Sequence, residues 1–129
     1  MQVPIRSDQD IVAARQKGRQ LAVSIGFSAS EATLVATAIS ELARNIILYA
    51  RRGEICLQLV EQSERRGIVV TAHDEGPGIQ DIRRALQDGY STSRSLGLGL
   101  PGVRRLMDEF DITSEVGKGT TVTVKKWKR

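Results

Sequence analysis

Two glycine-rich segments constrain the fold of this chain more than any other feature. Asp74-Glu75-Gly76-Pro77-Gly78 directly follows an apolar run typical of a strand, and Gly97-Leu98-Gly99-Leu100-Pro101-Gly102 leads into a helix. Glycine permits positive φ and close approach of the backbone to a ligand. A turn that leads into a helix also presents unpaired N–H groups at the positive end of the helix dipole, which favours phosphate. The two segments together predict a nucleotide site, and the small, polar residues 89–95 between them predict a closing lid.

The length and composition predict one cytoplasmic domain that spans residues 1–129. The chain has 129 residues, of which 40% are apolar and 26% charged, as in ordinary soluble domains. No apolar run approaches the ~20 residues of a membrane span, and the N-terminus does not resemble a secretion signal. The single cysteine, Cys56, excludes an intramolecular disulfide, and its strand-like surroundings predict a buried, inert thiol.

The basic charge raises the question of nucleic acid. The net charge is +4, but the basic residues are scattered and aromatic residues make up only 4% of the chain, too few for a base-stacking surface. The basic residues 125–129 have a simpler interpretation as the solvated end of an edge strand. We therefore expect neither nucleic acid nor membrane as a partner, and a surface that favours anions such as ATP.

Helices are predicted first along the chain. Residues 1–6 form an extended start, and Ser7 with Asp10 begins a helix with apolar positions at helical spacing up to Gly26. Ser28 and Glu31 form a second capping box before a long helix that runs to about Tyr49 and is stopped by Gly53.

Strands dominate the remainder. Residues 54–61 alternate with period two, and residues 68–72 form an apolar run typical of a central strand. Short helices are predicted over 79–88 and 102–110, and residues 112–124 predict a hairpin that turns at 117–119. Helices followed by a sheet give an α+β fold, a two-layer sandwich.

Glu41 and Asn45 lie four residues apart on one face of the long helix. At about 100° per residue, both fall beside the apolar stripe, at the rim of a pocket between helix and sheet. An amide oxygen there can bind a hydrated Mg²⁺, and a carboxylate can accept a proton. Read alone, such a pair is more typical of a solvated helix face, and it gains weight only from the glycine segments downstream.

Asp74 stands at the end of a strand, where its carboxylate can accept a hydrogen bond from an exocyclic amine such as that of adenine. Read alone, residues 74–78 are as typical of a simple turn, and residues 97–102 of many loops that start helices. The latter segment is no Walker loop, because no Gly-Lys-Ser/Thr follows, and the Rossmann spacing is absent. The order and separation of the three elements are far more specific than any one of them.

These motifs resemble the N, G1 and G2 boxes and the terminal G-T motif of the GHKL ATPases and kinases, over essentially the whole chain. The residues that carry this resemblance are Glu41 to Asn45, residues 74–78, residues 97–102 and Gly119-Thr120. The phrases DIVAARQ, ISELARNI, GYSTS and GLPGVRRLMDEF resemble the small bacterial anti-sigma-type serine/threonine kinases most strongly. The resemblance implies the GHKL (Bergerat) ATP-binding fold, with helices over a mixed, largely antiparallel sheet.

The resemblance also implies roles for individual residues, with ATP and Mg²⁺ as cofactors. Glu41 would be the general base, and Asn45 the Mg²⁺ ligand. Asp74 would bind the adenine amine, with Thr120 assisting through water. The remaining positions are Gly76 and Gly78 in the base pocket, Gly97, Leu98, Gly99 and Gly102 in the lid over the phosphates, and Arg94, which would neutralise γ-phosphate charge or remain a solvated loop arginine. His73, the one histidine, is expected in a supporting or buried position.

By resemblance, the leading hypothesis is a kinase that phosphorylates a serine or threonine on a STAS-domain antagonist of the RsbS and RsbR type in a stressosome. Once released, the kinase would switch on a downstream output enzyme. Two alternatives stay open: an adaptor without chemistry of its own that activates a PP2C-type phosphatase, and an anti-sigma factor that binds a sigma factor directly.

Overall fold

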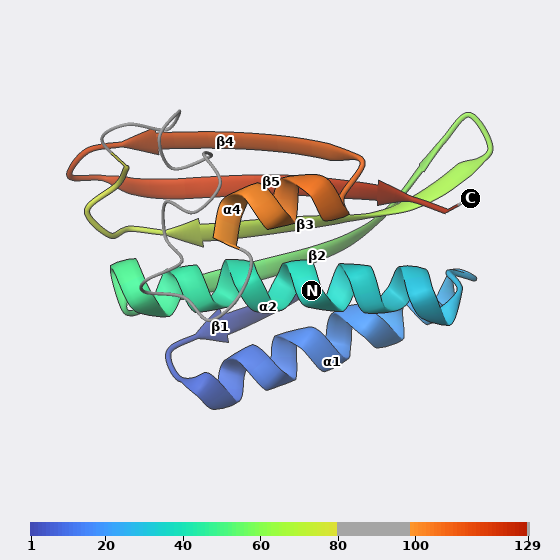
Figure 1. Ribbon diagram of the computed structural model, residues 1–129, viewed down its shortest axis with the longest axis horizontal. Coiled ribbons are helices and arrows are strands. Elements are labelled where there is room, and N and C mark those ends of the chain that lie inside the picture. Colours follow the sequence, from blue (N-terminus) through green and yellow to red (C-terminus); the bar gives the residue numbers. More distant parts are fainter. Residues whose placement is uncertain (80–98, 129) are drawn as a thin grey trace.

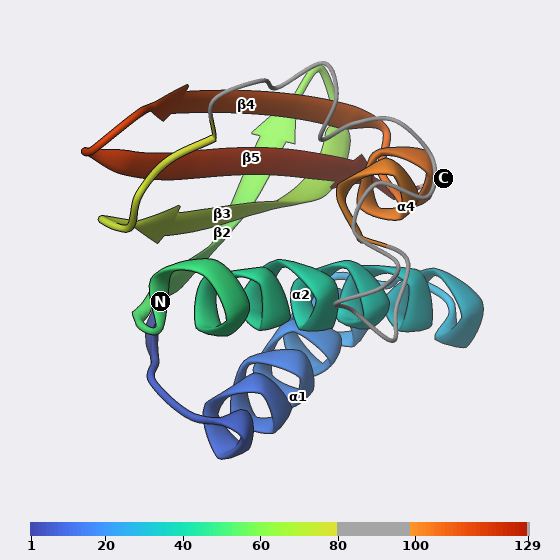
Figure 2. The same ribbon diagram turned by 60° about the vertical axis from the view of Figure 1, so that its left-hand side comes forward.

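The protein is a layered α+β structure in which helices cover one face of a five-stranded sheet (Figures 1 and 2). The computed structural model describes residues 1–79 and 99–128. The predicted helix over 79–88 and the lid residues 89–95 fall almost entirely outside this range. The described elements are β1 (Gln2–Ile5), α1 (Asp8–Ser24), α2 (Ala29–Ala50), β2 (Gly53–Gln62), β3 (Arg65–Asp74), α4 (Gly99–Leu106), β4 (Glu109–Glu115) and β5 (Gly119–Trp127).

The sheet has the strand order β1-β2-β3-β5-β4, and each of these pairings is antiparallel. The apolar run 68–72 lies in β3, the middle strand, as predicted. The resemblance implies a mixed, largely antiparallel sheet, and within the described residues all strand pairings are antiparallel. The interpretation of the basic C-terminal residues as the end of an edge strand is wrong for residues 125–127, because they belong to β5, which pairs with β3 on one side and β4 on the other. Residue 129 lies outside the described residues.

Both long helices begin at the predicted capping residues. The Asp10 carboxylate accepts a hydrogen bond from the Ser7 N–H, and the Ser28 hydroxyl accepts one from the Glu31 N–H at 3.1 Å. Each bond satisfies a backbone donor that the first turn leaves unpaired. After α1, Gly26 takes a positive φ of 95°, and the Phe27 N–H returns to the Ala22 carbonyl. The sequence therefore sets three of the four ends of these helices.

The fourth end, at the C-terminus of α2, differs from the prediction. Arg51 makes the turn with a φ of 72°, and Gly53 already begins β2. Glycine is still required at position 53, because a Cβ there would collide with the His73 carbonyl oxygen of the paired strand. Gly53 is thus a residue of close strand pairing and not a helix stop.

Helix α4 also departs from the prediction. It spans Gly99–Leu106 instead of 102–110, and Phe110 belongs to β4. Pro101 lies in the first turn of α4, where a missing N–H removes no helical hydrogen bond. At the other end, Lys126 Nζ donates to the Leu106 carbonyl at 3.2 Å, and the Asp108 N–H donates to the Lys125 carbonyl at 2.9 Å. These contacts with β5 end the helix and start β4.

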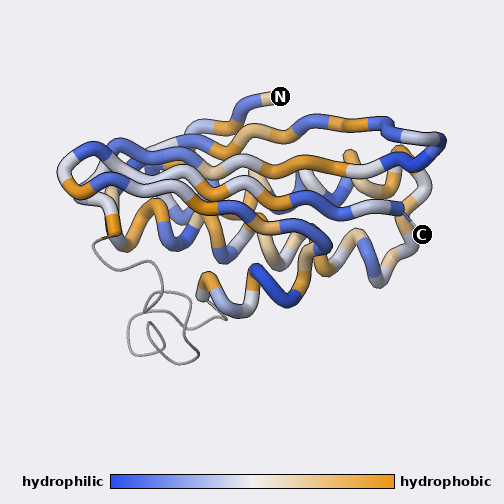
Figure 3. The backbone as a smooth tube through the Cα atoms, turned by 90° about the horizontal axis from the view of Figure 1, so that it is seen from above, coloured by the Kyte–Doolittle hydropathy of each residue, from blue (hydrophilic) through white to orange (hydrophobic). Residues whose placement is uncertain are grey.

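One hydrophobic core lies between the sheet and the helices. Seen from above the sheet, hydrophobic and hydrophilic residues alternate along the strands (Figure 3). The inward positions include Ile55, Leu57, Ile68, Val70 and Val124, each at most 1% exposed. Residues at even positions of β3 and β5 therefore face the helices, and odd positions face the other side. This alternation fixes the direction in which each site residue points.

The position of Cys56 follows the same alternation, and it differs from the predicted buried thiol. It lies between Ile55 and Leu57 and is half-buried rather than buried, because it points to the side of the sheet opposite the core. Among the described helices, none combines the length and apolar character needed to cross a membrane.

Candidate active site

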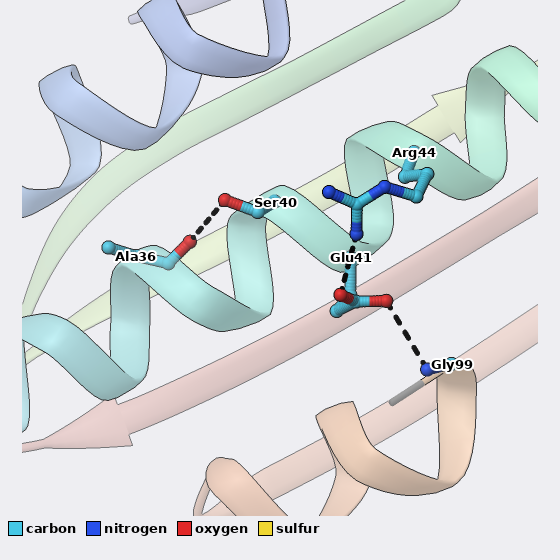
Figure 4. Close-up of polar contacts among 5 residues, drawn as sticks. All are labelled: Ala36, Ser40, Glu41, Arg44 and Gly99. Atoms are coloured by element: carbon cyan, nitrogen blue, oxygen red, sulfur yellow. Dashed lines mark hydrogen bonds and ion pairs between the residues drawn. The ribbon is translucent and has the colours of Figure 1, made fainter. Parts of the chain in front are cut away.

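Glu41 lies in the middle of α2 and connects that helix to α4. Its side chain is 6% exposed, and its Oε1 forms an ion pair of 2.7 Å with Arg44 Nη1. Its Oε2 accepts a hydrogen bond from the Gly99 N–H at 3.3 Å (Figure 4). The Gly99 amide belongs to the first residue of α4, so a negative charge here is stabilised by the helix dipole. The residue predicted as general base is thus a buried, oriented carboxylate that contacts the second glycine segment at the start of α4.

Asn45 lies one turn after Glu41 on α2, and its Oδ1 is buried without a hydrogen-bond partner among the described residues. A buried amide oxygen normally has a partner, because leaving it unpaired costs about 1–3 kcal/mol. This atom has the chemistry of a Mg²⁺ ligand. Within residues 1–79 and 99–128, His, Cys, Asp and Glu side chains form no cluster of three that could hold a metal. A Mg²⁺ ion held by Asn45 would take its other ligands from phosphate and water.

Asp74 and Thr120 lie directly opposite each other on β3 and β5. Both stand at even positions, so both face the helices near the C-terminal end of α2. Asp74 Oδ1 accepts a hydrogen bond from the Gly76 N–H at 2.9 Å, which leaves Oδ2 as an acceptor for a ligand. The two residues predicted to act on adenine are therefore brought together by strand register.

The two glycines that follow Asp74 lie in tight surroundings. A Cβ on Gly76 would contact Ala50, the last residue of α2. Gly78 has a φ of 78°, and a Cβ there would collide with the Glu115 carbonyl at the end of β4. The close approach of this backbone to a base stays a prediction, since the atoms nearest to an added Cβ belong to Ala50 and Glu115.

Ser114 is a further candidate residue that the sequence patterns do not indicate. Its hydroxyl accepts a hydrogen bond from the Ile79 N–H at 2.7 Å and lies 2.8 Å from Thr120 Oγ1. It also lies 3.1 Å from the Gly119 carbonyl. Ser114 therefore fixes the end of the first glycine segment to the hairpin that carries Thr120. The predicted hairpin would have revealed it, since its register places Ser114 beside Thr120.

The other predicted positions divide into two groups. Gly99 and Gly102 are buried in α4, and Gly99 supplies the amide that contacts Glu41. Arg94, Gly97 and Leu98 lie outside the described residues.

His73 is half-buried on the side of the sheet away from Asp74, and its Nδ1 lies 2.8 Å from Thr121 Oγ1. It lines a hollow of about 280 Å³ that Thr113, Ser114, Lys118, Thr120 and Thr121 also border, so it is not fully buried.

The described site thus has two ends along α2. Glu41, Asn45 and the first turn of α4 lie at one end, and Asp74, Thr120 and Ser114 lie at the other, near Ala50. The first end has the groups that suit phosphate and Mg²⁺, a buried amide oxygen and a helix N-terminus. The second end has the acceptors that suit the amine of a base.

Comparison with known proteins agrees with this geometry. Residues 5–126 match the family described as the histidine kinase-like ATPase domain. The chain is 51% identical over 127 residues to the serine/threonine-protein kinase RsbT of Bacillus subtilis (strain 168), covering 98% of this chain and 96% of that protein. It is 36% identical over 104 residues to the anti-sigma F factor of Geobacillus stearothermophilus, covering 74% of this chain and 69% of that protein.

Among solved structures, the chain is similar to one in the SiaB–SiaC complex from Pseudomonas aeruginosa. The TM-score is 0.58 with 12% identity, over 98% of this chain and 89% of that chain, so the likeness concerns the fold alone. The family match and the relative at 51% identity together cover nearly all of the chain. The chain therefore belongs to the histidine kinase-like ATPase (GHKL) family, in its branch of serine/threonine protein kinases.

Proposed function

We propose that the chain transfers the γ-phosphoryl group of ATP to a serine or threonine of a STAS-domain antagonist, of the RsbS or RsbR type, in a cytoplasmic stressosome. The identity to a serine/threonine kinase over nearly the full chain supports the reaction class. The single observation that carries the proposal is the buried Glu41 carboxylate, held at the N-terminus of α4 one turn from an unpartnered amide oxygen.

In the proposed reaction, the substrate hydroxyl oxygen attacks the γ-phosphorus, the bond to the β–γ bridging oxygen breaks, and ADP leaves. Glu41 accepts the hydroxyl proton at Oε2, because the 3.3 Å hydrogen bond from the Gly99 N–H engages this oxygen less closely than the 2.7 Å contact with Arg44 engages Oε1. A Mg²⁺ ion bound to Asn45 Oδ1 would neutralise phosphate charge. Such a reaction depends mainly on positioning and charge stabilisation, which these residues can supply without a covalent intermediate.

At the other end of the site, Asp74 Oδ2 would accept a hydrogen bond from the adenine amine, and Thr120 would assist through water. Guanine has a carbonyl at the corresponding position, so the carboxylate would favour adenine over guanine. Ser114 would act indirectly, by holding Thr120 and the backbone at Ile79 in place.

Phosphorylation would add about −1.5 to −2 charge to the antagonist, and we propose that this charge weakens its complex with the kinase. The released kinase would then bind and switch on a downstream output enzyme. Phosphorylation of the antagonist would thus cause the kinase to exchange one partner for another.

Incubation with MgATP and a purified STAS-domain antagonist, followed by mass spectrometry of phosphopeptides, tests the proposal. We expect phosphoserine or phosphothreonine with the unmodified chain and none with Asn45→Ala. Either the absence of phosphopeptide with the unmodified chain or equal transfer by Asn45→Ala would contradict the proposal.

A second candidate function, an anti-sigma factor, is favoured by the 36% identity to an anti-sigma F factor over 74% of the chain. Such a protein would bind a sigma factor directly. Capture of purified sigma factors on the immobilised chain, compared with capture of the STAS-domain antagonist, distinguishes the two functions.

A further inference from the structure

Arg44 lies at the exposed edge of the site and contacts the carboxylate that the proposed reaction uses. The distance from Arg44 Nη1 to Glu41 Oε1 is 2.7 Å, and the side chains of Arg44 and Glu41 are 36% and 6% exposed. The two residues are three positions apart on α2, so the rigid helix itself holds them at contact distance. Figure 4 shows the guanidinium on one side of the carboxylate and Gly99 on the other.

A carboxylate at this place presents an electrostatic problem for a site that binds a triphosphate. Like charges close together in a partly buried pocket repel each other strongly, because little water is present to screen them. Glu41 is the buried acidic residue of the described chain, and it lies at the helix terminus best suited to phosphate. An unpaired Glu41 would therefore oppose nucleotide binding at the same position.

We propose that Arg44 is a positioning residue that makes the two negative groups compatible. It has two effects, both through Glu41. It engages Oε1, so that Oε2 is directed toward α4, and its positive charge offsets the carboxylate charge when phosphate binds nearby. The inference rests on the proposed function, because it requires that the site binds ATP.

Direct contact between Arg44 and phosphate is the principal alternative. A guanidinium that binds phosphate would be needed whether or not position 41 is charged. A guanidinium that compensates for Glu41 becomes unnecessary once position 41 is neutral. The two roles therefore differ in how Arg44 and Glu41 depend on each other, and a double-mutant cycle measures that dependence.

The test uses calorimetric binding of a non-hydrolysable ATP analogue with Mg²⁺ to the full chain and to Arg44→Ala, Glu41→Gln and the double variant. We expect Arg44→Ala alone to weaken binding about 10-fold to 100-fold. In the Glu41→Gln background, the same change should weaken binding less than about 3-fold, within the range of an exposed charge. Arg19→Ala, at an exposed position of α1, controls for the loss of one positive charge.

Phosphotransfer kinetics supply the second measurement. Arg44→Ala should raise the KM for ATP and also lower kcat, since the carboxylate loses its orientation, and Arg44→Lys should restore most of the affinity but less of kcat. An equal loss of affinity in both backgrounds, or no loss in either, would overturn the inference while leaving the kinase assignment intact. A wild-type chain that binds no nucleotide would instead overturn the proposed function. Thermal unfolding of each variant establishes that it is folded.

Discussion

Asp74 at the end of β3 is directly paired with Thr120 near the start of β5, and Ser114 on β4 is paired with Thr120 on its other side. Three residues from three strands thus form a row at the end of the sheet that adjoins α2. Because antiparallel partners point to the same face, the register alone directs all three toward the proposed base pocket.

Replacing Asp74 with alanine should weaken MgATP binding by about 10-fold to 100-fold, the range for losing a hydrogen bond to a charged group. Discrimination between ATP and GTP should fall as well. Calorimetric titration with both nucleotides provides the measurement. Glu75→Ala, at the exposed neighbouring position, is the matched control and should leave both affinities unchanged. If Asp74→Ala still preferred ATP to GTP, another group would have to distinguish adenine from guanine.

Replacing Glu41 with glutamine should lower the rate of phosphotransfer by about 100-fold or more, because the amide cannot accept the proton. The glutamine oxygen can still accept the Gly99 hydrogen bond, so nucleotide binding should not weaken. Single-turnover kinetics and calorimetry together separate the two effects. A similar rate in Glu41→Gln and in the exposed control Glu61→Gln would exclude Glu41 as the base.

Replacing Asn45 with leucine should separate stability from function. The unpartnered Oδ1 is removed and the branched shape of the side chain is kept, so the free energy of unfolding should stay the same or rise by about 1 kcal/mol. The dependence of ATP affinity on Mg²⁺ should disappear. Denaturant unfolding and binding titrations with and without Mg²⁺ test both statements. A destabilised variant that keeps its Mg²⁺ dependence would contradict the assigned role.

Two glycines of the β4–β5 hairpin give a matched stability test. Gly119 has a φ of 123°, and a Cβ there would collide with the Asp74 carbonyl oxygen. Gly117 has a φ of 83° with nothing within 4 Å of an added Cβ. Gly117→Ala should therefore cost about 1–2 kcal/mol for backbone conformation alone. Gly119→Ala should cost more and should also weaken ATP binding, because it displaces Asp74. Equal costs for the two variants, measured by denaturant unfolding, would show that the strands separate without penalty.

Local signals in the sequence predicted much of the fold. The sequence predicts the capping boxes at Ser7 and Ser28 and the helix end at Gly26, because each depends only on residues within a few positions of each other. The alternation of residues 54–61 likewise indicates a strand that is buried on one face, and the apolar run 68–72 indicates a strand that is buried on both faces. The spacing of Glu41, Asn45 and Asp74 matches the pattern of the histidine kinase-like ATPase family, to which the chain belongs.

Tertiary contacts decided the features that the sequence did not reveal. Helix α4 ends at Leu106 because Lys126, twenty residues later, donates to its last carbonyl. The end of β5 is covered because Lys125 pairs with Glu109 of β4 and the Trp127 N–H donates to Asp108 Oδ2, although its composition is typical of an exposed strand. The Glu41 contacts with Gly99 and the bridge from Ser114 to Ile79 join residues that are 58 and 35 positions apart. Local propensity extends over one or two turns, so the sequence by itself determined the elements and the chemical groups. Only packing of the sheet against the helices determined which groups meet, because that depends on strand register and on contacts between distant segments.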